Sequence, residues 1–250
     1  MPMYRAAVAL FSLLLPLAAA QAQAAELRVF SSTALKAVLD NLGPQFEKAS
    51  GNKLVYTIGP AAVMKLQIDQ GAAFDVAILT PPLTDALATA GKIDPTSRAT
   101  VARAGLGVAV RAGAAKPDVS TADGLKQAIL NAKSIGFNGQ GASRLGIEAM
   151  FAKLGLTDAV KPKIKLLQES APVAVAAGQV EIGLGPVSEI VAVSGAQVAG
   201  AFPAEYQSYL VLLGSVAADC KNADAAMALL KFLTAPAAAA VLKANGMEPG

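Results

Sequence analysis

The chain has 250 residues with 21 basic and 18 acidic side chains, a formal net charge of +3, and 5% aromatic residues. The basic residues are scattered and form no stripe interleaved with aromatic side chains, so we expect no nucleic-acid partner. The sequence contains no histidine and one cysteine, Cys220. This excludes a disulfide within the chain, a histidine general base and a cysteine–histidine pair. We therefore expect neither a metal nor a cofactor.

The first 24 residues have the pattern of a secretory signal peptide. Arg5 precedes an apolar stretch over residues 6–20, and the small residues Ala22 and Ala24 mark a cleavage site after Ala24. The apolar stretch is shorter than the roughly twenty residues that a membrane span needs. The pattern predicts export to the periplasm and a mature chain that begins at residue 25.

Strand-like apolar runs and helical patterns alternate in the first third of the mature chain. The expected strands cover 27–30, 53–59 and 75–79, and the expected helices cover 34–50 and 63–71. This β-α-β-α-β order predicts an α/β fold with parallel strands joined by right-handed helical crossovers. The helix starts then lie at the carboxyl edge of the sheet, where α/β folds bind ligands.

The rest of the chain continues the alternation. The elements expected there are a strand over 105–113, a helix from about Gly124, a strand over 134–137, a helix over 144–154, a segment over 163–170, a helix over 173–179, a strand over 181–189, segments over 197–202 and 206–216, helices over 222–236 and 237–246, and an exposed tail. Apolar strands near 105–112 and 204–210 can cross between two lobes. The predicted lobes are residues 25–108 with 208–250, and residues 109–207.

Several segments resemble the molybdate-binding (ModA-type) family of periplasmic solute-binding proteins. They include VFSSTALKAVLDNLGPQFEKASG, QIDQGAAFDVAIL, GKIDPTSRAT and LKFLTAPAAAAVLKANGM, and together the matching stretches span nearly the whole mature chain. The resemblance implies the two-lobed, type II periplasmic-binding-protein fold, with parallel-rich sheets, two hinge crossovers and the ligand between the lobes.

Members of this family hold tetrahedral oxyanions with hydroxyls and backbone N–H groups at helix starts. At the positions that match, this chain has Ala34 in place of a serine, Ala61 within a loop that is usually a run of serines, and Pro186 in place of a tyrosine; Ser143 matches the third loop. A buried oxyanion without donors faces a desolvation cost of several kcal/mol. The departures therefore favour a ligand other than molybdate.

Other side chains near these positions suit a carboxylate. Ser31, Ser32 and Thr33 come just before Ala34, and the guanidinium of Arg144 matches a carboxylate in two hydrogen bonds. The sequence predicts a small organic polycarboxylate as ligand, held by a set of residues comprising Ser31, Ser32, Thr33, Ala61, Ser143, Arg144, Ser170 and Pro186. Helix capping alone also explains the run of hydroxyls, and a solvated helix start also explains Arg144.

Three functions remain open at this point. One branch of the resembling family is a periplasmic aconitate isomerase, which would move an allylic proton; without histidine the base would be Glu169 or Lys65. A non-catalytic receptor would deliver a small organic anion to the permease of an ABC importer, and a molybdate receptor is the third reading. A monomer is expected in each case.

Overall fold

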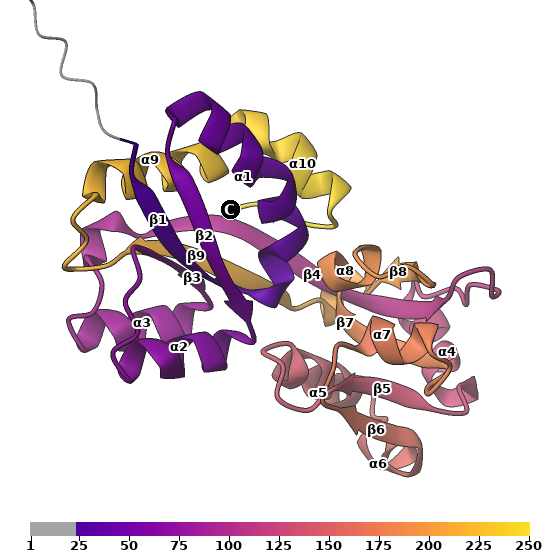
Figure 1. The fold of residues 1–250 in the computed structure, drawn as a ribbon. Helices are drawn as coiled ribbons and strands as arrows, with labels where there is room; N and C mark the ends of the chain where they lie inside the picture. Colours follow the sequence, from indigo (N-terminus) through magenta and orange to yellow (C-terminus); the bar gives the residue numbers. More distant parts are fainter. Residues whose placement is uncertain (1–23) are drawn as a thin grey trace, which may run out of the picture.

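The computed structural model describes residues 24–250, so the predicted signal peptide, apart from Ala24, lies outside the described residues. The strands form one continuous hydrogen-bonded network in the order β2-β1-β3-β9-β4-β7-β5-β6, with β8 and β10 also paired to β4. Figure 1 shows two α/β lobes joined through β4. We call the lobe that holds β1, β2, β3, β9, β10 and the first half of β4 the first lobe, and the other the second lobe.

The first lobe opens with three parallel strands, since β1 pairs in parallel with both β2 and β3. Its elements are β1 (Glu26–Ser32), η1 (Thr33–Leu35), α1 (Lys36–Ser50), β2 (Lys53–Gly59), α2 (Ala61–Asp69), β3 (Val76–Leu79), α3 (Pro81–Thr89), η2 (Pro95–Ser97), β9 (Tyr209–Val216), α9 (Ala223–Thr234), η5 (Pro236–Ala238), α10 (Ala239–Ala244) and β10 (Glu248–Pro249). The parallel order expected from the alternating pattern is confirmed here.

The second lobe repeats this scheme with β5 at its centre, paired in parallel with β6 and β7. Its elements are α4 (Ala122–Asn131), β5 (Ile135–Asn138), α5 (Arg144–Lys153), α6 (Thr157–Val160), η3 (Lys161–Lys163), β6 (Ile164–Leu167), α7 (Ala171–Ala176), β7 (Ile182–Pro186), α8 (Val187–Val191), β8 (Ala196–Ala201) and η4 (Ala204–Tyr206). The two lobes are therefore joined twice, by β4 and by the segment from β8 to β9.

β4 (Ala99–Arg111) is the long strand that belongs to both lobes. Its first half pairs antiparallel with β9 as far as Gly105, and its second half pairs antiparallel with β7 and β8 from Leu106 onward. The buried side chains divide at the same point, because Ala104 packs in the first lobe's core and Leu106 in the second lobe's core. We retain the predicted lobe limits, 25–108 with 208–250 and 109–207, as a proposal.

Helix α1 illustrates how the sequence pattern builds these cores. Its buried residues Val38, Leu39, Leu42 and Phe46 recur at helical spacing and pack against the sheet. The helix ends at Gly51, whose φ of 76° lies in the left-handed region that glycine adopts without strain. Burial of one helical stripe against a sheet is thus the main stabilising interaction of this element.

The structure differs from the expected elements in four places. β4 begins at Ala99, six residues before the expected strand, and α3 was not anticipated at all. The chain end is only in part an exposed tail, because Met247 is 2% exposed and β10 pairs with β4 through Glu248 and Arg103, whereas Pro249 and Gly250 are exposed. The expected strand over 181–189 ends at Pro186, where α8 takes over. The short length of β10 and α8 gives too little periodicity for a sequence pattern to detect.

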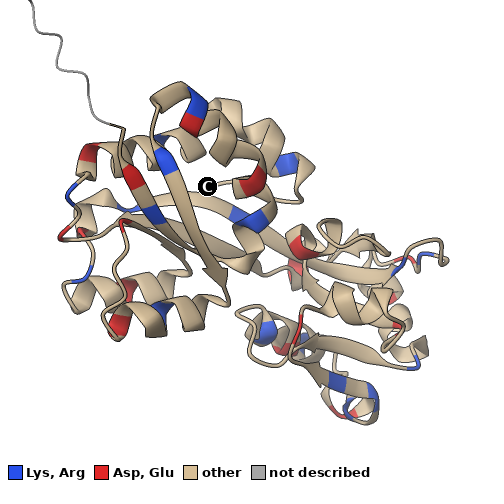
Figure 2. Ribbon diagram, in the orientation of Figure 1, with Lys and Arg blue, Asp and Glu red and all other residues tan. Residues whose placement is uncertain are grey.

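Charged residues of both signs are interspersed over the described part of both lobes (Figure 2). Among residues 24–250, no single helix has the length and composition of a membrane span; α9 and the segment Pro236–Ala244, bent by 53°, meet those criteria only as a pair. The buried face of α9, which includes Leu229 and Leu233, packs in the core of the first lobe.

Candidate functional site

The carboxyl ends of β1 and β2 bring several predicted site residues together. Ser32, the last residue of β1, lies opposite Gly59, the last residue of β2, so that η1 and α2 begin side by side. Ser31 and Ser32 are 0% and 7% exposed, Thr33 is exposed, and Ala61 is buried at the start of α2. The structure thus groups these four predicted residues at one edge of the first lobe.

Three serines that precede helical segments in the two lobes do not cap them. Ser32, Ser143 and Ser170 occupy the positions before η1, α5 and α7, and none makes a side-chain capping hydrogen bond. At the start of α4, by contrast, Thr121 accepts a hydrogen bond from the Gly124 N–H at 3.1 Å. The hydroxyls of these serines therefore remain available as donors. Ser31 differs, since its hydroxyl donates to the Ser32 carbonyl at 3.3 Å.

In the second lobe, Asn138 joins the loop before α5 to the loop before α7. Its side-chain amide, at the carboxyl end of β5, donates to the carbonyls of Gln168 and Glu169 at 3.0 and 3.2 Å. The same residue lies opposite Leu167 at the end of β6. Because of these contacts, the loop that carries Glu169 and Ser170 lies beside the loop that leads to α5.

The two predicted cations are already engaged in ion pairs. Lys65 lies 2.5 Å from Asp69, one turn along α2. Arg144 donates to Glu148 at 2.7 Å and to the Gly139 carbonyl at 3.0 Å. Both pairs are partly exposed, and such pairs contribute only about 0–1 kcal/mol. The pairing leaves both cations free to exchange partners when an anion binds.

α8 packs against helical segments of both lobes. It begins directly after Pro186, which is buried at the end of β7, and it contacts both η1 and α7. The chain end also packs on it, because a Cβ on Gly246 would lie 2.9 Å from Val187 and 3.1 Å from the Ser188 nitrogen. Pro186 and the helix after it therefore lie between the segments that follow Ser32 and Ser170.

Two polar side chains of α8 were not included in the predicted site. The Ser188 residue is 3% exposed and its hydroxyl has no hydrogen-bond partner among the described residues. Burial raises the pKa of the Glu189 carboxyl to about 7. In the sequence Glu189 is only the last residue of the expected strand over 181–189, which is a weak signal, because the partial burial that changes its chemistry comes from the tertiary contacts of α8.

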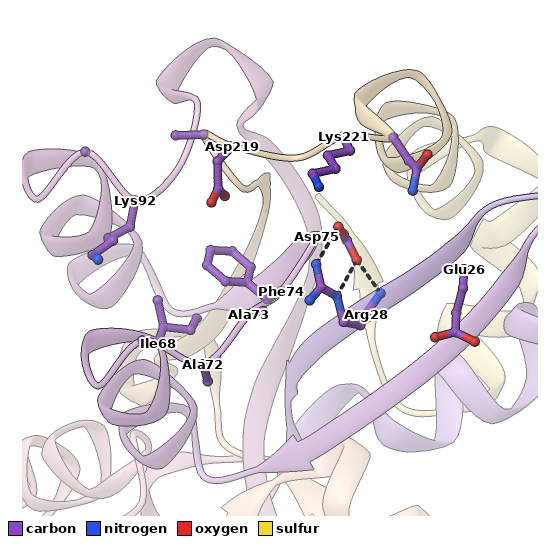
Figure 3. A pocket seen from close by; sticks show the side chains of 14 residues that line it. Glu26, Arg28, Ile68, Ala72, Ala73, Phe74, Asp75, Lys92, Asp219 and Lys221 are labelled. Atoms are coloured by element: carbon purple, nitrogen blue, oxygen red, sulfur yellow. Dashed lines mark hydrogen bonds and ion pairs between the residues drawn. The ribbon is translucent and has the colours of Figure 1, made fainter.

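A pocket of about 770 Å³ lies elsewhere, at the opposite edge of the first lobe's sheet. Figure 3 shows it lined by Lys92, Asp219 and Lys221 around the Arg28–Asp75 pair. Arg28 donates to Asp75 through Nε at 2.9 Å and through Nη2 at 3.1 Å.

Asp75 has a structural role in this pocket. It also accepts the Arg28 backbone N–H at 2.8 Å and the Cys220 thiol at 3.6 Å. Burial raises the pKa of Asp75, but the hydrogen bonds and the charge of Arg28 lower it more, so that it lies below its usual value. The carboxylate is fully occupied in joining the starts of β1 and β3, and it is not positioned for chemistry at the strand ends.

A second pocket, of about 830 Å³, lies in the second lobe between β4 and α4 and includes Arg111 and Lys133. Neither pocket contains any of the predicted site residues. In residues 24–250, no group of three His, Cys, Asp or Glu side chains lies close enough together to hold a metal ion. We take the helix starts at the carboxyl ends of the strands as the candidate site, because the predicted residues Ser31, Ser32, Thr33 and Ala61 gather there in the first lobe and the Asn138 contacts join the corresponding loops of the second lobe.

Comparisons with known proteins identify the family of this chain. Residues 27–248 match the family described as bacterial extracellular solute-binding protein. The chain is 28% identical over 240 residues to an aconitate isomerase from Pseudomonas sp., covering 94% of this chain and 91% of that protein. It is 32% identical over 244 residues to the molybdate-binding protein ModA of Azotobacter vinelandii, covering 92% of each.

The solved structure of the Azotobacter vinelandii periplasmic molybdate-binding protein superposes with a TM-score of 0.76 at 24% identity, over 90% of this chain and 99% of that one. This likeness shows the fold, namely the two-lobed α/β fold of periplasmic binding proteins. Together with the match over residues 27–248, it confirms the family expected from the sequence. The chain belongs to the bacterial extracellular solute-binding protein family and is a ModA-like member of it.

Proposed function

We propose that this protein is a periplasmic ModA-like protein that binds a small organic polycarboxylate and interconverts cis- and trans-aconitate. The similarity to an aconitate isomerase over 94% of the chain supports the proposal. The altered positions support it as well, because Ala34, Ala61 and Pro186 offer no side-chain hydroxyl to a compact oxyanion.

The observation that carries the proposed polycarboxylate ligand is the set of uncapped serines, whereas the isomerase activity is proposed from the similarity to an aconitate isomerase. Ser32, Ser143 and Ser170 each precede a helical segment at the carboxyl edge, and their hydroxyls make no capping bond. The backbone N–H groups of a helix start favour an anion. Hydroxyl donors spread over two lobes suit a ligand that carries several separate carboxylates.

Arg144 and Lys65 are proposed to supply positive charge. Each is held by an acid four residues along its own helix, in a partly exposed pair that costs little to open. A guanidinium matches a carboxylate in two parallel hydrogen bonds. Glu169, on the loop held by Asn138, is retained with Lys65 as a proton-transfer group proposed from the sequence.

A receptor without catalysis is the second candidate, supported by the 32% identity to ModA. In that case the protein delivers a small organic anion, or molybdate, to the permease of an ABC importer. The uncapped serines would serve this function equally well, since binding alone needs donors and no proton transfer.

Two measurements on the purified mature protein separate these functions. Thermal unfolding with cis-aconitate, trans-aconitate, citrate, molybdate, tungstate and sulfate identifies the ligand class, because a ligand of the folded state raises the melting temperature. Incubation with trans-aconitate, followed by chromatography, tests turnover. The proposal expects shifts with the tricarboxylates and formation of cis-aconitate. Tight tricarboxylate binding without conversion would leave the receptor, and a shift with molybdate and tungstate alone would exclude the polycarboxylate.

A variant pair tests the proposed role of Arg144. Arg144→Ala is expected to weaken tricarboxylate binding more than tenfold, as the loss of a charge-assisted hydrogen bond of about 1.5 kcal/mol or more would do. Arg98→Ala is the matched control, because Arg98 also forms a surface pair, with Asp85, but lies in the segment between η2 and β4. Equal affinities of Arg144→Ala and the wild type would remove Arg144 from the site.

A further inference from the structure

We propose that Glu189 is the residue that carries the proton between the two ends of the substrate's allylic system, an inference that rests on the isomerase function proposed above. Glu189 would take this role in place of Lys65 and Glu169, the two candidates selected from the sequence, because neither of them lies on α8. Lys65 is paired with Asp69, and Glu169 lies in the loop before α7.

The position of α8 is the first argument. The helix lies beside β4 on the side of the second lobe nearest to α1 (Figure 1), and it contacts both η1 and α7. Glu189 is therefore on a short helix that contacts both the segment begun by Ser32 and the segment begun by Ser170. A ligand held by hydroxyls of both lobes would lie next to this helix.

The surroundings of the Glu189 carboxyl are the second argument. It makes no ion pair, and its side chain takes part in no hydrogen bond among the described residues. On β4, β7, β8, η1, α7 and the chain end after α10, which pack against α8, the charged side chains are Arg103 and Arg111 of β4 and Glu248 of β10. Arg103 is paired with Glu248 at 2.8 Å. Lys36, which follows η1, is paired with Asp40 at 2.6 Å. The carboxyl is thus partly buried, and none of these charged side chains is paired with it.

Partial burial brings the pKa of the carboxyl close to neutral pH, which is what a proton carrier needs. The pKa of Glu189 is raised to about 7, and burial is the cause. Near neutral pH the group is present in both forms, so it can accept a proton in one half of the reaction and return it in the other. An ordinary exposed glutamate is almost fully ionised at this pH and is a weaker acid–base catalyst.

The reaction balances with this single group. The Glu189 carboxylate takes a proton from the methylene carbon of trans-aconitate, and the C–H electron pair forms a new double bond to the central carbon. The original double bond moves its electrons to the former vinyl carbon, which takes the proton back from the Glu189 carboxylic acid. The double bond has then shifted by one carbon and can carry the cis geometry, with no oxidant or reductant required.

The unpartnered Ser188 hydroxyl adds an independent sign of a ligand on this helix. Buried hydroxyls in folded proteins are nearly always hydrogen-bonded, so one without a partner indicates a site that a ligand or water can complete. Its residue is 3% exposed and is the neighbour of Glu189. A substrate carboxylate placed against α8 would accept a hydrogen bond from this hydroxyl and would lie close to Glu189.

The test compares Glu189→Gln and Glu189→Asp with the wild type in the trans-aconitate assay, with proton exchange from D₂O into the substrate followed by NMR. Glu205→Gln is the matched control, since Glu205 is an exposed glutamate of η4. We expect Glu189→Gln to lower kcat at least a hundredfold with KM changed less than about threefold, and to abolish deuterium exchange. Glu189→Asp is expected to retain partial activity, and Glu205→Gln full activity.

The outcomes separate the inference from the function on which it rests. If the wild type converts trans-aconitate and Glu189→Gln retains more than a third of its kcat, the role of Glu189 is wrong while the isomerase function stands. If the wild type shows neither conversion nor deuterium exchange, the isomerase function itself fails, and Glu189 with it. Thermal unfolding of each variant at pH 5, where Glu189 is protonated in the folded wild type, shows whether the substitution has disturbed folding instead.

Discussion

The side chain of Gln207 pairs with both backbone groups of Leu106, the residue at which β4 passes from one lobe to the other. Its amide oxygen accepts the Leu106 N–H at 2.6 Å, and its amide nitrogen donates to the Leu106 carbonyl at 3.1 Å. The same amide also bonds the Phe202 carbonyl at 3.3 Å and the Ser208 N–H at 3.1 Å. One side chain therefore fastens the two connections between the lobes to each other.

Gln207→Ala is expected to lower the free energy of unfolding by about 1–3 kcal/mol, because it leaves the Leu106 N–H without a partner in a buried part of β4. Urea unfolding followed by circular dichroism measures the change. Gln207→Glu should also destabilise, since a carboxylate cannot donate to the Leu106 and Phe202 carbonyls. Gln45→Ala, on the exposed face of α1, serves as the control and should change stability by less than about 0.5 kcal/mol.

Asp75→Asn is expected to destabilise the protein at neutral pH by about 2 kcal/mol through weakening of the Arg28 pair. The pKa of Asp75 lies below its usual value, so its contribution to stability is present above the unfolded-state pKa of about 4 and is lost as pH falls through the folded-state value. The difference between variant and wild type should therefore shrink below about pH 4. Asp85→Asn, in the exposed pair with Arg98, should show a difference below about 1 kcal/mol at any pH.

Gly43 and Tyr56 form a coupled pair in the first lobe. A Cβ on Gly43 would collide with the Tyr56 hydroxyl oxygen, which is buried without a hydrogen-bond partner among the described residues. Gly43→Ala should therefore lower the unfolding free energy by about 1–3 kcal/mol, whereas Tyr56→Phe, which removes an unpartnered hydroxyl, should be neutral or stabilising.

A double-mutant cycle by urea unfolding tests this relationship. The double variant is expected to be more stable than Gly43→Ala alone, with a coupling energy of at least about 0.5 kcal/mol. Additive effects of the two substitutions would show that the hydroxyl is not what limits the space at Gly43.

Glu189→Gln is expected to be more stable than the wild type at pH 8, and the difference between the two proteins is expected to be smaller at pH 4. The pKa of Glu189 is raised to about 7 in the folded state, so the folded wild type holds a proton that the unfolded chain loses from about pH 4 upward. Wild-type stability therefore falls between about pH 4 and pH 7 and then levels off, by about 1–2 kcal/mol after allowing for partial exposure. Parallel pH–stability curves of the two proteins would contradict the raised pKa.

Much of the fold could be predicted because it depends on local patterns. The apolar run at 53–59 and the helical stripe of Val38, Leu42 and Phe46 identify their elements without any partner. Elements that exist only through pairing could not be found in this way. β10 is two residues long, and its pairing with Arg103 and Ala102 of β4 is what makes it a strand.

The candidate site, too, could be predicted from the sequence only in part. Ser32, Ser143 and Ser170 could be selected from the sequence because each follows a strand or loop and precedes a helix. The absence of a capping bond from any of them could not, since a serine before a helix predicts a cap. Likewise, the ion pairs of Lys65 and Arg144 follow from helical spacing, but whether these side chains bind a ligand does not.

The sequence by itself determined the α/β class, the parallel order of the first three strands and the residues that follow each strand end, because these depend on periodicity and spacing along the chain. Only the tertiary structure decided which helix starts lie next to one another and how far each acid is withdrawn from solvent. Glu189 was an unremarkable residue of the sequence. Its pKa of about 7 arises because α8 is packed among segments distant in the sequence, and burial without a counter-ion penalises the charged form.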